Sequence, residues 1–185
     1  WEDLFLEGPK FISVHPEQDS LNFVAPTAKY DLDNHIITAE GVKLIRVADA
    51  TIYTDDGKVV VEKKAVMRPI KNARIIANTT NRYHEIKNST VNIYGRNKYT
   101  AYGDYDYVDK AGQIQNIHFK RVGVDGTGQT FAKGEIPVTD DFELSPNFKY
   151  QGDVELSANK KNLTFEGAVK LKQKCKNINT SWVKF

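Results

Sequence analysis

The chain has 185 residues, of which 40% are apolar and 27% are charged, and this composition excludes a disordered chain. Lysine and arginine number 26 and aspartate and glutamate 24, so the net charge of +2 does not indicate nucleic acid as a partner. No apolar run approaches the ~18 residues that a transmembrane segment needs. In chain order, residues 1–6 are the best helix candidate, and nearly all later elements are expected to be strands.

Short segments in which apolar and polar residues alternate follow one another along the chain, with the period of two that is typical of strands. Residues 54–57 read Thr-Asp-Asp-Gly, a hairpin or turn sequence, and a short apolar strand is expected directly after them. Residues 71–78 carry Ala73, Ile75 and Ala77 on one side. Further strands are expected at 90–94, 113–122, 154–156, 163–165 and 169–171.

Glycine and Asx residues interrupt these segments at intervals of about ten residues, a spacing that belongs to a sandwich, a barrel or a β-solenoid. No long stretch shows the helical spacing of apolar residues, and no Gly/Ser-rich linker divides the chain. We therefore expect one all-β domain over residues 1–185, an elongated, repeat-built β-jellyroll or β-solenoid with little or no helix. The single cysteine, Cys175, allows no internal disulfide and is interpreted as a structural residue rather than a reactive thiol.

Two parts of the chain resemble each other in sequence. Residues 26–30 read Pro-Thr-Ala-Lys-Tyr and residues 146–150 read Pro-Asn-Phe-Lys-Tyr. Downstream, residues 37–44 resemble residues 163–171 around a shared Glu-Gly pair. The similarity predicts one unit of strand, Glu-Gly turn and strand that is used twice. Chance likeness between two β-rich segments is the alternative.

The most unusual local feature is a run of alternating aspartates and tyrosines. In a strand, Asp104 and Asp106 lie on one face and Tyr105 and Tyr107 on the other. The two carboxylates could form a glycosidase-like pair or bind calcium, but glycosidase pairs come from different strands and the later residues of a calcium loop are missing. A solvent-facing acidic stripe backed by packed tyrosines is favoured. Together with Tyr102, these four residues form the candidate binding surface, on which the tyrosines either stack on sugar rings or, as we favour, pack between strands.

No arrangement typical of an enzyme is present in the sequence. The four histidines lack the spacing of a zinc site, and no G-x-S-x-G nucleophile elbow occurs. The glycines at 123–128 are spaced as G-x-x-G-x-G, which differs from a phosphate-binding loop and predicts a tight turn between two strands. We therefore predict no catalytic residue, no metal site, no cofactor and no enzymatic activity.

Residues 23–30 and 37–44 resemble the OstA-like, or LptA-type, envelope proteins, whose strands repeat the phrase x-A-x-G-x-V-x-L between short polar turns, and residues 162–171 repeat the phrase. The resemblance covers about a third of the chain. It implies a periplasmic β-jellyroll with an apolar interior that holds lipid acyl chains. Residues 99–109 and 180–185 have no counterpart in the family pattern, and no individual functional residue is carried over.

These observations predict a non-catalytic β-repeat module of a cell-envelope or secreted protein, located outside the cytoplasm. The chain begins with Trp1 and has no initiator Met, so a processed protein or a fragment of a longer one is expected. The expected partners are a lipid or another amphiphile in an apolar groove, or a glycan, and adjacent repeats of the same protein. A carbohydrate-binding or carbohydrate-active β-sandwich or β-helix is the alternative function.

Overall fold

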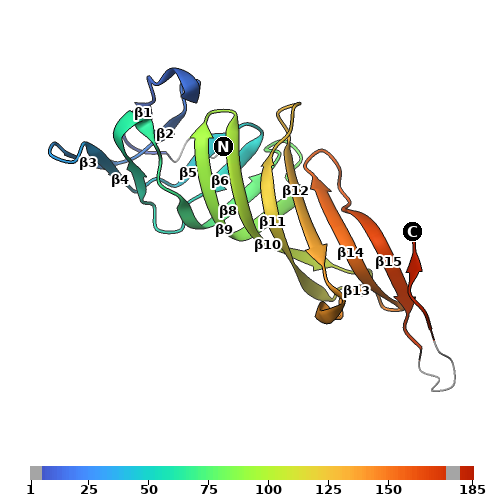
Figure 1. Ribbon diagram of the computed structural model, residues 1–185. Helices are drawn as coiled ribbons and strands as arrows, with labels where there is room; N and C mark the ends of the chain where they lie inside the picture. Colours follow the sequence, from blue (N-terminus) through green and yellow to red (C-terminus); the bar gives the residue numbers. More distant parts are fainter. Residues whose placement is uncertain (1–5, 174–179) are drawn as a thin grey trace.

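The computed structural model describes residues 6–173 and 180–185 (Figure 1). Of the helix candidate only Leu6 is described, and it lies outside any helix, while Cys175 lies outside the described residues. The described residues form strands joined by turns and three single-turn 3-10 helices, so the predicted all-β fold is confirmed. The three helical turns are η2 (Pro16–Gln18), η3 (Lys63–Ala65) and η4 (Val138–Asp140).

Most strands of the described residues belong to one antiparallel sheet of 13 strands. Its members, in chain order, are β1 (Lys10–Ile12), β2 (Asn22–Val24), β5 (Leu44–Val47), β6 (Ala50–Tyr53), β8 (Ile70–Ala77), β9 (His84–Gly95), β10 (Lys98–Val108), β11 (Ile114–Val124), β12 (Thr130–Ile136), β13 (Glu143–Ser145), β14 (Phe148–Ser157), β15 (Thr164–Leu171) and β16 (Val183–Lys184). A second sheet consists of β3 (Thr27–Asp31), β4 (Ile36–Glu40) and β7 (Val59–Val61). In Figure 1 the small sheet lies at one end of an elongated row of strands and β15 lies at the other.

Two turns of the same sequence pattern join the long central strands into a meander. Asp109 and Asp125 each begin a five-residue D-x-x-G-Q turn, the first between β10 and β11 and the second between β11 and β12. In each turn the aspartate carboxylate accepts hydrogen bonds from two backbone N–H groups, and the glycine, Gly112 or Gly128, has a φ of +81°. A left-handed backbone at that position favours glycine. The turn predicted at 123–128 is therefore confirmed.

The strands predicted in the central and C-terminal parts of the chain are present. β8 buries Ala73, Ile75 and Ala77 as expected, and β9, β11, β14 and β15 cover the other predicted segments. Within β11 a bulge after Phe119 shifts the alternation, and Val122 is the next buried residue. Bulges of this kind change which side chains face the core without ending the strand.

Two local predictions differ from the structure. Residues 54–57 do form a turn, but the flanking strands β6 and β7 belong to different sheets, so they do not form a hairpin with each other. Glu40 ends β4 and Gly41 follows it with a φ of +79°, whereas Gly167 lies inside β15 and pairs with Gly152 of β14. The predicted unit of strand, Glu-Gly turn and strand is therefore wrong for the second copy, where the glycine allows two strands to approach closely instead of forming a turn.

The long sheet curls over itself, as contacts between turns of its two halves show. The Asp49 carboxylate, between β5 and β6, accepts hydrogen bonds from the backbone N–H and the hydroxyl of Thr130 at the start of β12. The side-chain amide of Asn81 donates to the carbonyl oxygen of Ala158, 77 residues away. The hydrophobic core lies between the two halves, and its largest fully buried apolar side chains are Tyr99, Tyr150, Phe119, Ile45, Ile52, Ile75, Ile86, Ile117 and Leu156. The finer assignment as a jellyroll or a solenoid stays a prediction.

Candidate functional site

An open cavity lies at the end of the molecule that the N-terminal third of the chain forms. Its volume is about 640 Å³, within the range of roughly 300–1,000 Å³ that small-molecule sites occupy. One wall comes from the β1–β2 hairpin with η2, and the other comes from the three-stranded sheet with η3. The apolar lining residues are Phe11, Ile12, Val14, Pro16, Leu21, Phe23, Tyr30, Ile37, Val61, Ala65 and Met67.

This N-terminal cavity is the open end of the hydrophobic core. Leu21, Phe23 and Met67 line the cavity and are at the same time buried members of the core cluster. Phe11 stacks on Phe23 with the ring centroids 5.5 Å apart and is itself only partly buried. At the rim, the side chain of Val14 is 97% exposed. An apolar surface that continues from a core to solvent is typical of a binding site for an apolar group.

A partly buried hydrogen bond joins the two walls. The side-chain amide of Gln18, at the end of η2, donates to the carbonyl oxygen of Ala65 in η3, and Gln18 is only 7% exposed. Lys64 and Ala65 both have a left-handed backbone, with φ of +61° and +59°. Two consecutive non-glycine residues in this region are unfavourable, and such strain is concentrated at binding and switch regions. The contact with Gln18 therefore holds a strained turn against the cavity.

The charged part of the lining is predominantly positive. Lys63 and Lys64 lie at the mouth of the cavity. The acidic lining residue, Glu62, forms an ion pair with Arg68 in which Oε1 and Nε are 2.6 Å apart. Among residues 6–173 and 180–185, no side chain forms an ion pair with either lysine. The mouth therefore combines an apolar wall with two cations that are free to bind a ligand.

Aromatic side chains close the opposite end of the interior. Phe142 is buried and packs between Tyr107 and Tyr150, with ring centroids 5.3 Å and 6.5 Å from its own. Phe165 completes the group, 5.6 Å from Tyr107 and 5.1 Å from Tyr150. Edge-to-face contacts of this kind stabilise a packed core beyond the burial of area. These rings fill part of the apolar interior at this end, whereas the cavity of about 640 Å³ lies at the N-terminal end.

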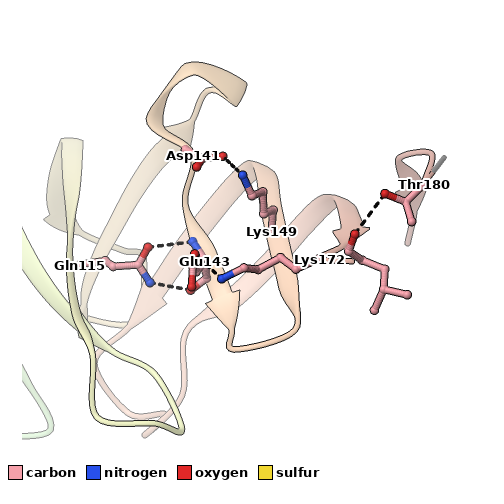
Figure 2. Close-up of polar contacts among 7 residues, drawn as sticks. Gln115, Asp141, Glu143, Lys149, Lys172 and Thr180 are labelled. Carbon is pink, nitrogen blue, oxygen red and sulfur yellow. Dashed lines mark hydrogen bonds and ion pairs between the residues drawn. The ribbon is translucent and has the colours of Figure 1, made fainter. Parts of the chain in front are cut away.

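The segment that carries Phe142 is fixed by polar contacts, and we call residues 137–145 the strap. Figure 2 shows Gln115 of β11 in two hydrogen bonds with the main chain of Glu143. Its side-chain nitrogen donates to the carbonyl oxygen at 2.6 Å, and its side-chain oxygen accepts from the N–H at 2.7 Å. The Glu143 carboxylate also forms an ion pair with Lys172. One side chain thus satisfies both backbone groups of a strap residue, as a neighbouring strand would.

Of two further contacts, one involves a strap residue and the other lies beside the strap. Lys149 of β14 forms an ion pair with Asp141, and the Thr180 hydroxyl donates to the carbonyl oxygen of Leu171 at 3.1 Å (Figure 2). The cavity at this end has a volume of about 440 Å³ and a lining rich in lysine. It lacks the continuous apolar wall of the N-terminal cavity, so the N-terminal cavity is the better site for an apolar ligand.

The structure places the sequence-predicted residues on both faces of β10, as alternation requires. Asp104 and Asp106 lie on the outer face, and Tyr105 and Tyr107 pack against the core. Tyr102 lies on the outer face with the aspartates and is 47% exposed. The five residues therefore do not form one surface, because two of the three tyrosines are turned inward.

Both predicted carboxylates are bonded to neighbouring side chains. Asp104 Oδ1 lies 2.8 Å from Nδ1 of His118, and Asn88 donates to the other oxygen at 3.1 Å. The bond to His118, assisted by Asn88, holds the pKa of Asp104 below its usual value against the opposing effect of partial burial. Lys87 Nζ lies 2.7 Å from Asp106 Oδ2. The predicted acidic stripe is present on the outside of the sheet, where hydrogen bonds to His118 and Asn88 hold Asp104 and an ion pair with Lys87 holds Asp106.

The inward tyrosines have packing and hydrogen-bonding roles. The hydroxyl of Tyr107 donates to the carbonyl oxygen of Leu144 in the strap at 2.9 Å. Burial raises the pKa of the Tyr105 and Tyr107 hydroxyls. Tyr102 presents its ring to solvent, with the ring centroid 6.3 Å from that of His118. Of the candidate tyrosines, Tyr102 is therefore the one that is placed to stack on a ligand.

The sequence analysis proposed none of the residues that line the N-terminal cavity as site residues, although Phe23, Tyr30 and Ile37 lie in the segments that resemble OstA-like proteins. An apolar residue at every second position is expected both in a packed face and in a cavity wall, and Phe23 belongs to both. The available signal is weak: β1 is short, and Ile12 within it and Val14 after it are exposed apolar residues. Within residues 6–173 and 180–185, no three His, Cys, Asp or Glu side chains are grouped as a metal site, and no helix could span a membrane.

Comparison with known proteins gives no relative: no protein-family model, curated protein or solved structure matches the chain. The function is therefore inferred from the cavity, its charges and the packing around it.

Proposed function

We propose that the chain is a non-catalytic β-module that binds the apolar part of a lipid or another amphiphile in the N-terminal cavity. The observation that carries the proposal is an open cavity of about 640 Å³ whose walls continue the hydrophobic core. An apolar chain placed there gains about 0.8 kcal/mol for each CH2 group that leaves water. Because the cavity ends in the core and opens at a charged mouth, it suits a ligand with one apolar and one polar end.

The likeness to OstA-like proteins supports the same function, since members of that family hold acyl chains in an apolar interior. It also supports a location outside the cytoplasm and a role as one module of a longer protein. We propose that adjacent repeats of the same protein pair with the ends of the long sheet. These ends are β1 on one side and, on the other, β16, which pairs with β15 over two residues. Open strand edges present unpaired N–H and C=O groups that can extend a sheet.

The outer face of β10 does not support an enzymatic function. Asp104 and Asp106 lie away from the N-terminal cavity, and each is bonded to a neighbouring side chain. The pKa of Asp104 is held below its usual value by the bond to His118, whereas a general acid needs a raised pKa. We therefore propose no catalytic role for either residue.

Carbohydrate binding is the second candidate function, and the exposed ring of Tyr102 beside His118 is the observation that favours it. Exposed aromatic rings can stack on the apolar face of a sugar. A glycan array probed with the wild type and with Tyr102→Ala tests this function. Binding that the substitution abolishes would support it, and an array without any signal would remove it.

A displacement titration tests the proposed amphiphile binding. The purified protein is saturated with a fluorescent fatty-acid analogue, laurate is added below its micelle concentration, and native mass spectrometry gives the stoichiometry. We expect saturable displacement and discrete ligand-bound mass peaks. The proposal is wrong if neither the analogue nor laurate binds to folded protein.

A further inference from the structure

We infer that the ligand of the N-terminal cavity is an anionic amphiphile whose oxyanion headgroup, such as a carboxylate, is bound by Lys63 and Lys64. The inference rests on the proposed function and narrows its ligand class. It follows from the structure of the loop at residues 61–67. The base of this loop is apolar, and its tip carries the two lysines at the mouth.

The loop is closed at its base by two residues of the apolar wall. Val61 and Met67 pair as an isolated β-bridge, and both line the cavity. The N–H of Glu62 donates to the carbonyl oxygen of Val66 at 2.7 Å, which tightens the base. An acyl chain that lies against Val61 and Met67 would therefore end a few residues from the tip of the same loop.

The tip of the loop carries the charge. Lys63 and Lys64 are exposed and line the mouth, and His15 and His35 line the same cavity. The acidic lining residue, Glu62, is already neutralised by its ion pair. An oxyanion placed at the mouth would therefore meet uncompensated positive charge, whereas a cationic headgroup would be repelled.

The backbone of the turn that carries the two lysines is held in place before a ligand binds. Lys64 and Ala65 hold left-handed backbone conformations, and the buried Gln18 side chain bonds the Ala65 carbonyl oxygen. A turn that is held in place in this way loses little backbone freedom when a ligand binds. Strain at a loop that presents two free cations is consistent with a binding role for that loop.

Three ligands with the same alkyl chain test the inference: laurate, dodecanol and dodecyltrimethylammonium. Their affinities are measured for the wild type, for Lys63→Gln with Lys64→Gln, and for a control, Lys160→Gln with Lys161→Gln, which removes the same charge from an exposed turn far along the chain. We expect laurate to bind most tightly to the wild type, and its affinity to fall as salt is added. The double substitution at the mouth should weaken laurate by about two- to tenfold and leave dodecanol unchanged.

Each other outcome shows whether the headgroup assignment or the proposed function is wrong. If all three ligands bind the wild type equally, or if the mouth variant binds laurate as tightly as the control does, the headgroup assignment is wrong and the apolar site stands. If the mouth variant loses dodecanol as well as laurate, the lysines act on the structure of the loop and the assignment is again wrong. If no ligand binds the folded wild type, the proposed function itself fails.

Discussion

The imidazole Nε2 of His84 lies 2.6 Å from the main-chain carbonyl oxygen of Lys160, 76 residues further along the chain. His84 begins β9 and Lys160 lies in the turn between β14 and β15, so the contact joins the two halves of the curled sheet. The imidazole is 1% exposed, and its Nδ1 lies 3.2 Å from the hydroxyl of Tyr105. A neutral ring satisfies both contacts, with Nε2 donating and Nδ1 accepting.

The His84 contact makes stability depend on pH. Burial lowers the pKa of His84 in the folded protein, and the bond to the Lys160 carbonyl opposes this only in part. In the unfolded chain a histidine has a pKa of ~6.5. Below that pH the unfolded state takes up a proton more readily, so the free energy of unfolding falls until the pH passes the lowered pKa of the folded state. Chemical denaturation between about pH 8 and pH 5 should show a smaller loss of stability for His84→Gln than for the wild type. Equal losses would contradict this account.

The strap depends on the side chain of Gln115. Gln115→Ala removes both hydrogen bonds to the main chain of Glu143 and leaves its N–H and C=O without these partners. We expect a loss of about 1–3 kcal/mol in the free energy of unfolding, with faster amide hydrogen exchange in the strap. Asn116→Ala, on the exposed face of the same strand, is the matched control and should change stability by less than about 0.5 kcal/mol. Similar effects of the two substitutions would show that the strap does not need Gln115.

The close approach of β14 and β15 needs a glycine at 167. A Cβ on Gly167 would lie 2.2 Å from the carbonyl oxygen of Gln151 and 2.8 Å from Cα of Gly152. Gly167→Ala should therefore lower the free energy of unfolding by about 1–3 kcal/mol, because the neighbouring main chain must shift. Gly126→Ala is the control, since a Cβ there has no atom within 4 Å. Thermal unfolding compares the two, and an unchanged transition for Gly167→Ala would refute the prediction.

The cavity wall should be sensitive to charge on one face of β4. Ile37 lines the cavity and pairs with Val61 of the neighbouring strand β7, whereas Thr38 points to the other face of β4. Ile37→Glu places a carboxylate where the acyl chain would lie, so we expect laurate affinity to fall more than about tenfold. Thr38→Glu should bind within about twofold of the wild type. Calorimetric titration of both variants makes the comparison, and equal affinities would place the ligand elsewhere.

Local features of the fold could be predicted from the sequence, and contacts between distant turns could not. Alternation places Ala73 and Ile75 on the buried side of β8 because the two faces of a strand follow directly from residue order. The paired D-x-x-G-Q turns are also a local signal that the sequence contains. The contact between Asp49 and Thr130 depends on how strongly the sheet curls, and this curl sums small twists over many strands.

For the candidate site too, only the local features could be predicted from the sequence. The opposite faces of Asp104 and Tyr105 follow from alternation, and the structure confirms them. The position of the cavity does not follow from the sequence, because apolar residues such as Phe23 and Met67 suit both a covered core and an open cavity wall. The positive φ at Lys64 could not be predicted from the residue type, since lysine rarely adopts a positive φ. The tertiary contact beside it is the hydrogen bond from Gln18 to the carbonyl oxygen of Ala65, which joins residues 47 apart.

Paramagnetic relaxation in methyl NMR spectra, with a fatty acid that carries a spin label on its chain, is the most direct test of where the ligand lies. If the acyl chain occupies the N-terminal cavity, the methyl signals of Ile37, Val61 and Met67 will broaden strongly, and those of Ile117 and Leu156 in the closed part of the core will not. Reduction of the label should restore the broadened signals. Broadening that is centred on residues outside the cavity, or no broadening at saturating ligand, would contradict amphiphile binding at this site.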